Sequence, residues 1–306
     1  MNNHKFNTHH HHDQMGHGHN HHAIKNIKVA FFLNLFFTLI EIWGGFLTNS
    51  MAILSDALHD FGDTLIIGFS LYFIKRSQKS RDQKYSYGYK RLSLLGAFIS
   101  AIILSMGSIF IVLKTIPRLV NPQDVHAPGM FLLAVFGVLV NGLAVWRLQK
   151  GQSPNERVVR LHLLEDVFGW LAVLIGSVLI YWFNWLIIDP LLSLAIAGYI
   201  LYNAIKNIRD FIRIFLQGIP KDISLETISA EISQIKDVLS AHDLHIWSMD
   251  GEYNVLSAHL VIKENLTNLE IIAIKNQARQ ILHKYNITHE TLELEYANET
   301  CSFENC

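Results

Sequence analysis

The sequence predicts an α-helical membrane protein with six transmembrane helices and a C-terminal cytosolic α+β domain. Three observations lead to this fold class. Half of the 306 residues are hydrophobic and only 17% are charged, which is too few ionic groups to cover soluble domains of this length. Six apolar stretches are long enough to cross a bilayer. After Arg209 the composition changes, and apolar residues alternate with Lys, Glu and Asp.

The six apolar stretches follow one another in the first two thirds of the chain. They are Val29–Leu47, Met51–Ile74, Leu92–Leu113, Met130–Trp146, Leu161–Phe183 and Trp185–Ile205. None contains an internal Lys or Arg. Because a helix of about 20 apolar residues spans the hydrocarbon core, each stretch predicts one transmembrane helix.

The distribution of positive charge predicts the orientation. Lys and Arg are concentrated in the loops 75–91 and 147–160, and such loops stay on the cytosolic side. An even number of spans then places both termini of this multi-pass protein in the cytosol. No cleaved signal peptide is predicted, because a hydrophilic stretch precedes the first span.

The N-terminal segment 1–24 is predicted to be a disordered tail. It holds nine of the 17 histidines, between His4 and His22. A tract of this kind binds metal weakly but does not build a site in a packed core. The helices are then assigned to residues 25–208, the soluble domain to 209–298 and a second tail to 299–306. The only two cysteines, Cys301 and Cys306, lie in that last tail, where they cannot staple a fold.

The soluble domain shows an α-β-β-α-β pattern. Residues 224–236 have helical spacing with Ser224 as a plausible N-cap. Residues 241–249 and 253–262 read as strands joined by Asp250-Gly251, which is a strong hairpin signal. A second helix, 268–285, and a third strand, 289–296, follow. This order implies two layers, with both helices on one face of a three-stranded sheet.

Composition also excludes classes of function. The formal net charge of −1 leaves no surplus of cations to neutralise the phosphates of a nucleic acid. The low charged fraction argues against a soluble enzyme, and no catalytic cofactor is predicted.

Two His-Asp pairs lie inside predicted spans. The second span contains His59 and Asp63, and the fifth contains His162 and Asp166. Residues four positions apart share one helix face. If the two helices touch, two imidazoles and two carboxylates meet, and this is a tetrahedral ligand set that suits Zn²⁺.

Each pair could instead be an interhelical hydrogen bond, as polar residues in membrane bundles often are. Two copies of the spacing, with no Lys or Arg in any span to neutralise the carboxylates, favour a cation site. By length, however, His59 and Asp63 flank the middle of their span, whereas His162 is near the start of its own. A water-filled cavity or a displaced helix is needed to bring the pairs level.

Other acidic residues lie in or beside the spans. Asp56, Asp60 and Glu165 are predicted to line the path of the ion or to support its ligands. Asp56 is either a reserve ligand or part of this path, or it only forms hydrogen bonds near the start of its helix. Glu41 and Asp189 are assigned to supporting, interface or boundary roles.

At these positions the sequence resembles the cation diffusion facilitator family, in its bacterial zinc-exporting branch with zinc or cadmium as substrate. The resemblance covers nearly the whole chain. It rests on Asn49-Ser50, on Ser55-Asp56-Ala57-Leu58-His59 with Asp63, on Tyr87-Gly88-Tyr89-Lys90-Arg91, on His162-Leu163-Leu164-Glu165-Asp166, on Gly218-Ile219-Pro220, and on His242-Asp243-Leu244-His245-Ile246-Trp247.

The resemblance implies a homodimer, a cytosolic ferredoxin-like domain that dimerises, and exchange of metal for protons. The transport ligands would be His59, Asp63, His162 and Asp166, and a His at position 59 favours zinc, with cadmium second and cobalt possible.

Two further metal sites of the family match only partly. The loop site would fall on Asp82, Tyr85 and Tyr89, where two expected imidazoles are missing, so that site is predicted to be absent. The cytosolic site would fall on His242, His259, Glu293 and Glu295. Two interpretations of these residues remain. They bind a regulatory zinc ion, or they are a His at a strand edge beside solvent-exposed acidic side chains.

Two other functions remain as alternatives to a proton-coupled carrier. A membrane-embedded zinc hydrolase would be expected to show an H-E-x-x-H run, and the sequence has none. A cation channel could use acidic residues for selection, but a four-ligand site holds a transition metal too tightly for rapid conduction.

Overall fold

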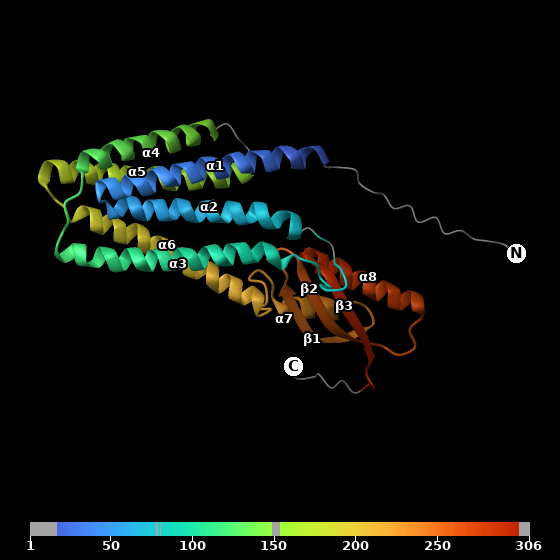
Figure 1. Ribbon diagram of the computed structural model, residues 1–306. Coiled ribbons are helices and arrows are strands. Elements are labelled where there is room, and N and C mark those ends of the chain that lie inside the picture. The colour runs from blue at the N-terminus through green and yellow to red at the C-terminus, as the bar shows by residue number, and fades with distance from the viewer. Residues whose placement is uncertain (1–16, 78, 80, 149–153, 300–306) are drawn as a thin grey trace.

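The computed structural model describes residues 17–77, 79, 81–148 and 154–299, and it has two parts (Figure 1). Six long helices lie side by side and form the helical bundle. A small sheet with two helices forms the C-terminal domain at one end of that bundle. Residues 1–16 of the His-rich tract, together with Cys301 and Cys306, lie outside the described residues.

The helical bundle confirms the predicted order of long helices. It consists of α1 (His17–Thr48), α2 (Met51–Ser77), α3 (Arg91–Val120), α4 (Ala127–Leu148), α5 (Pro154–Phe183) and α6 (Ile188–Phe215). Within the described residues, five of these helices are long and apolar enough to cross a membrane. The exception is α2, whose hydropathy is lowered by Asp56, Asp60 and Asp63. It packs against α1, α3 and α6 inside the same bundle.

Several helices extend beyond the predicted spans. α1 begins at His17, so residues 17–24, predicted to belong to the tail, have helical backbone. α6 continues to Phe215, past the boundary predicted at residue 208. α5 begins at Pro154, a residue favoured in the first turn of a helix, and it therefore starts two turns before His162.

The outer surface of the helical bundle is apolar. Large side chains on several helices are more than half exposed, among them Phe36, Trp43, Phe110, Leu132 and Trp182. A soluble protein rarely exposes a continuous apolar surface of this kind. In a bilayer the same side chains contact acyl chains, so the surface agrees with the membrane fold.

The start of α2 is held by a residue of α6. Asp189 is almost fully buried and accepts hydrogen bonds from the Ser50 hydroxyl and from the backbone N–H groups of Met51 and Ala52. These N–H groups belong to the first turn of α2 and have no partner within the helix. The boundary role predicted for Asp189 agrees with this contact, which fixes α2 along its own axis.

The C-terminal domain confirms the predicted α-β-β-α-β order. It consists of α7 (Leu225–Ser233), β1 (Val238–Ser248), β2 (Asn254–Ile262), α8 (Asn268–Lys284) and β3 (Ile287–Tyr296). β2 is the central strand and pairs antiparallel with β1 and parallel with β3. The predicted N-cap is present, because Ser224 accepts a hydrogen bond from Thr227 N–H. β1 and β3 begin a few residues earlier than predicted.

Both helices of this domain cover one face of the sheet. α7 and α8 contact each other, and Ile228, Ile232 and Leu282 pack on Leu256 and Leu260 of β2. Because side chains alternate along a strand, the odd-numbered residues of β2 point to the opposite face. That face carries the polar residues described below.

The loop between α2 and α3 lies against the C-terminal domain. The Lys90 ammonium stands 4.0 Å from the ring centroid of Tyr253 in the β1–β2 hairpin. The Tyr87 ring meets the His289 ring of β3 with centroids 5.5 Å apart. The two parts of the chain are therefore in direct contact through this loop.

Candidate metal centre

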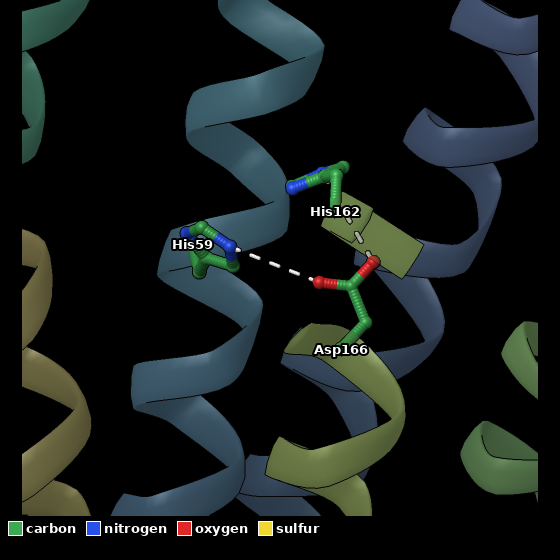
Figure 2. A group of neighbouring side chains, drawn as sticks. All are labelled: His59, His162 and Asp166. Atoms are coloured by element: carbon green, nitrogen blue, oxygen red, sulfur yellow. Dashed lines mark ion pairs between the residues drawn. The ribbon is translucent and has the colours of Figure 1, made fainter. Parts of the chain in front are cut away.

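The four predicted ligands lie together where α2 and α5 approach each other. His162 Nε2 is 2.9 Å from Asp63 Oδ2, and His59 Nε2 is 3.8 Å from Asp166 Oδ1. Within each helix the His and Asp are 3.9–4.0 Å apart. Figure 2 shows His59 on α2 and Asp166 on α5 pointing towards each other, with His162 one turn from Asp166. The two His-Asp pairs therefore lie at the same level of the bundle, and the difference in depth expected from the sequence is not present.

These separations resemble those within a bound metal site. In a tetrahedral zinc site with bonds of about 2.0–2.1 Å, neighbouring ligand atoms are about 3.3 Å apart. The four contacts above span 2.9–4.0 Å, and the two imidazole rings are 5.7 Å apart. His59, His162 and Asp166 can each offer one ligand atom within 4.8 Å of the others, and Asp63 Oδ2 contacts both imidazoles.

The carboxylates lack the hydrogen bonds that a purely structural cluster would have. Asp63 Oδ2 and Asp166 Oδ1 are buried and accept no aligned hydrogen bond, although Asp63 Oδ2 lies 2.9 Å from His162 Nε2. A buried acceptor without a donor is costly. The His162–Asp63 contact has the length of an interhelical hydrogen bond, whereas a shared cation would satisfy Asp166 Oδ1 as well.

The site is partly open at the side of His162. The side chain of His162 is 39% exposed, whereas that of Asp166 is 10% exposed. His59 and Asp63 are each about one quarter exposed. The imidazole of His162 is therefore the most accessible of the four groups and the carboxylate of Asp166 the least.

The other predicted acidic residues of α2 and α5 differ in position. Asp56 is buried and faces Gly169 of α5, where an added Cβ would lie 3.4 Å from Asp56 Oδ1. Seven residues separate it from Asp63, which is about 10 Å along a helix. Asp60 is buried as well, whereas Glu165 is exposed. The four predicted ligands thus lie together, whereas Asp56, Asp60 and Glu165 lie outside this cluster.

Glu41 is another almost fully buried acidic residue of the bundle. It is 1% exposed, and neither carboxylate oxygen has a hydrogen-bond partner among the described residues. It comes from α1, which packs on α2. The sequence indicated only a supporting role, because a single Glu in an apolar span does not reveal what it faces.

A second cluster lies on the sheet face that the helices leave open. His242 of β1 is paired with His259 of β2, and His259 is paired with Glu293 of β3. Glu295 lies between the two imidazoles, with carboxylate oxygens 3.3 Å from His242 Nε2 and 2.6 Å from His259 Nδ1. Glu293 Oε2 is 3.4 Å from His259 Nε2. All four residues predicted for the cytosolic site are thus adjacent.

Two residues beside this cluster were not predicted to belong to it. Asp243 Oδ2 is 3.6 Å from His259 Nε2, and Asp243 Oδ1 is 2.8 Å from His245 Nε2. Asp243 has a positive φ of 49°, and the strand register shifts between His242 and His245. Simple alternation would place Asp243 on the helix-covered face, so only the bulge turns it towards the imidazoles.

The loop between α2 and α3 uses its acidic residue differently. Asp82 accepts hydrogen bonds from Lys79 Nζ (2.9 Å) and from the Tyr89 hydroxyl (2.8 Å). The hydrogen bond from Lys79 and then that from Tyr89 hold the pKa of the Asp82 carboxyl well below its usual range. Its backbone partners are Lys84 and Tyr85. The Asp82 carboxylate is therefore already neutralised by an ammonium group.

Comparison with known proteins covers nearly the whole chain. A family model described as the cation efflux transmembrane domain matches residues 27–216, and one described as the cation efflux protein, cytoplasmic domain, matches residues 220–295. A protein of Bacillus velezensis called "Cadmium, cobalt and zinc/H(+)-K(+) antiporter" is 34% identical over 290 residues, covering 92% of this chain and 93% of its own. The "Zinc transporter ZitB" of Escherichia coli is 30% identical over 305 residues, covering 95% and 96%.

Proposed function

The chain belongs to the cation efflux family, and from this premise we propose that it exports Zn²⁺ from the cytosol in exchange for protons. It is a multi-pass membrane transporter and not an enzyme. The names of its relatives refer to zinc, cadmium and cobalt, so we propose Zn²⁺ as the main substrate and Cd²⁺ and Co²⁺ as further ones. We place the protein in a bacterial inner membrane with both termini in the cytosol.

One observation carries the proposed transport site. His59, His162 and Asp166 can each offer one ligand atom within 4.8 Å of the others, and Asp63 Oδ2 is 2.9 Å from His162 Nε2 and 3.9 Å from His59 Nε2. Neutral imidazoles and ionised carboxylates are the ligand forms that bind Zn²⁺. Two carboxylates also balance the charge of a divalent cation, which would otherwise be too costly to hold within a membrane.

The same ligands provide the coupling to protons. Metal and protons compete for the lone pairs of imidazole and carboxylate groups, so the site holds one or the other. Moving a dication outward against an inside-negative potential costs about 4.6 kcal/mol per 100 mV, and two entering protons offset that cost. Exchange for protons therefore makes export possible without another source of energy.

The acidic residues around the site have proposed roles of their own. Glu165 is exposed and adjoins Asp166, so it can attract the cation on its way to the ligands. Asp60 adjoins His59 and is buried, which suits a group that supports a ligand. Asp56 is about two turns from Asp63 and would meet the ion on the far side of the site.

An imposed proton gradient is expected to drive Zn²⁺ transport in proteoliposomes. Uptake should saturate with Zn²⁺ concentration, and a protonophore should abolish the gradient-dependent part. Since protonation displaces metal from these ligands, the apparent affinity should fall as the pH is lowered on the metal-binding side. Non-saturating flux that is indifferent to the proton gradient would instead indicate a channel.

We also propose that the cytosolic cluster binds a regulatory Zn²⁺ ion. His242, His259 and Glu295 can each offer one ligand atom within 4.8 Å of the others, and Glu293 is close enough to add a fourth. The His242 Nε2 atom is buried and has no hydrogen-bond partner among the described residues. A metal ion would supply that partner, and its ligands would come from all three strands of the sheet.

We further propose that the chain forms a homodimer through this domain.

The cytosolic site can be isolated in a full-length chain whose transport site is disabled. In a His59→Ala/His162→Ala background, equilibrium dialysis is expected to detect tightly bound zinc that disappears when His242→Ala and His259→Ala are added. The same pair of changes should remove the zinc-dependent rise in melting temperature, because a ligand that binds only the folded state stabilises it. His283→Ala, an exposed change on α8, is the control. Equal zinc binding in all variants would refute the site.

A further inference from the structure

A cavity of about 680 Å³ lies where the helical bundle meets the C-terminal domain. Its walls come from the end of α2, the following loop and the start of α3, the end of α6, and the residue that follows β1. Its apolar lining includes Leu92 and Leu95 of α3, Phe211 and Phe215 of α6, and Met249 of the C-terminal domain.

The lining of this cavity also includes positively charged residues. Arg76, Lys84 and Arg91 line it, and among the described residues none of the three forms an ion pair with an acidic side chain. The nearest acid in the loop, Asp82, is taken by Lys79 and Tyr89. The Arg91 Nε atom is buried without an acceptor. The cavity therefore has an excess of positive charge that nothing in the described chain balances.

The position of the cavity fits an amphipathic occupant. Arg76 and Arg91 stand at the ends of α2 and α3, where these helices leave the apolar zone, and Tyr85, Tyr87 and Tyr89 lie beside them. Tyrosines gather at the level of lipid headgroups. The cytoplasmic leaflet carries anionic lipids that attract Lys and Arg next to a transmembrane helix. A soluble anion would use only the charged side and would leave the apolar wall in water.

We propose that this cavity binds an anionic phospholipid, with the phosphate among Arg76, Lys84 and Arg91 and an acyl chain along Leu92, Leu95 and Phe215. Because Met249 also lines the cavity, the lipid contacts both parts of the protein and stabilises their junction. That the lipid comes from the cytoplasmic leaflet follows from the proposed orientation of the transporter. Lipid binding itself does not depend on transport.

Binding can be measured on the full-length protein in a neutral detergent without any metal. Short-chain dihexanoylphosphatidylglycerol is expected to raise the melting temperature saturably, since a ligand of the folded state stabilises it. The phosphatidylcholine with the same chains should have little effect. In Arg76→Gln/Lys84→Gln/Arg91→Gln the half-saturating concentration should rise about 100-fold, given the contribution of each cation to anionic-lipid binding.

The control removes three other cations close to the cytosolic ends of helices. Arg147→Gln/Lys206→Gln/Arg209→Gln has the same loss of charge outside the cavity and should bind phosphatidylglycerol like the wild type. If the cavity triple variant does not fold, Lys84→Gln alone should weaken binding about fivefold.

Three outcomes would overturn the proposal. Equal stabilisation by phosphatidylcholine would show that charge is not recognised. Equal stabilisation by inorganic phosphate would identify a soluble anion as the occupant. Loss of dimer in sedimentation for the cavity variant, with no response of the wild type to phosphatidylglycerol, would show that a second copy of the chain covers the cavity. None of these results bears on whether the protein transports zinc, so the two proposals fail separately.

Discussion

Replacing Asp166 with Asn is expected to reduce proton-driven Zn²⁺ transport by about 100-fold or more. Asn keeps the shape of the side chain but removes its charge and one strong metal ligand. Asp166 has the least exposed side chain of the four proposed ligands, at 10%, so water compensates poorly for the loss. Removing one partner from a buried set of charges costs about 3–5 kcal/mol, which corresponds to at least two orders of magnitude in metal affinity.

The measurement is zinc uptake into proteoliposomes with an imposed proton gradient. The matched control is Glu165→Gln, which removes the same charge from the adjacent, exposed residue. It should slow uptake at low zinc by no more than a few-fold and leave the proton dependence intact. Transport by Asp166→Asn within twofold of the wild type would contradict the assignment of α5 to the transport site.

Replacing His59 with Asp is expected to relax selectivity for zinc. The change converts two imidazoles and two carboxylates into one imidazole and three carboxylates. Carboxylate oxygen suits harder cations such as Mn²⁺, whereas imidazole suits Zn²⁺. The ratio of zinc to manganese transport should fall by at least about tenfold. Losing even a residue that only supports a metal ligand changes metal affinity by about that factor or more.

This selectivity is measured as metal-dependent proton flux across Zn²⁺, Cd²⁺, Co²⁺ and Mn²⁺. Recording protons rather than one metal tests selectivity and coupling together. His283→Asp, on the exposed face of α8, makes the same substitution away from the site and should leave the ranking unchanged. An unaltered ranking in His59→Asp would mean that His59 does not contact the ion.

The two sites were predictable from the sequence to different extents. The spacing of four residues fixes the face on which each His-Asp pair lies, because helix geometry is local. The level at which α5 passes α2 is not local, and it brings His162 within 2.9 Å of Asp63. In the C-terminal domain the register of β2 against β1 and β3 aligns His242, His259 and Glu293. The bulge that turns Asp243 towards the same cluster gave no signal in the residue pattern.

Helix ends were the least predictable part of the fold. Hydropathy marks where a helix is apolar and not where its hydrogen bonds end, so α1 and α6 both extend past their predicted spans. The start of α2 also depends on Asp189, a residue more than 130 positions away that accepts hydrogen bonds from its first turn.

By itself the sequence determined the membrane class and the order of the helices and strands, and it singled out the four residues that we propose as transport ligands. Composition and helical or strand periodicity are sufficient for these, since both depend on neighbouring residues. Only the tertiary structure decided which groups lie within reach of one ion, which carboxylates lack a donor, and how Arg76, Arg91 and Met249 come to line one cavity. These depend on contacts between segments far apart in the chain, which long-range packing sets and local sequence does not encode.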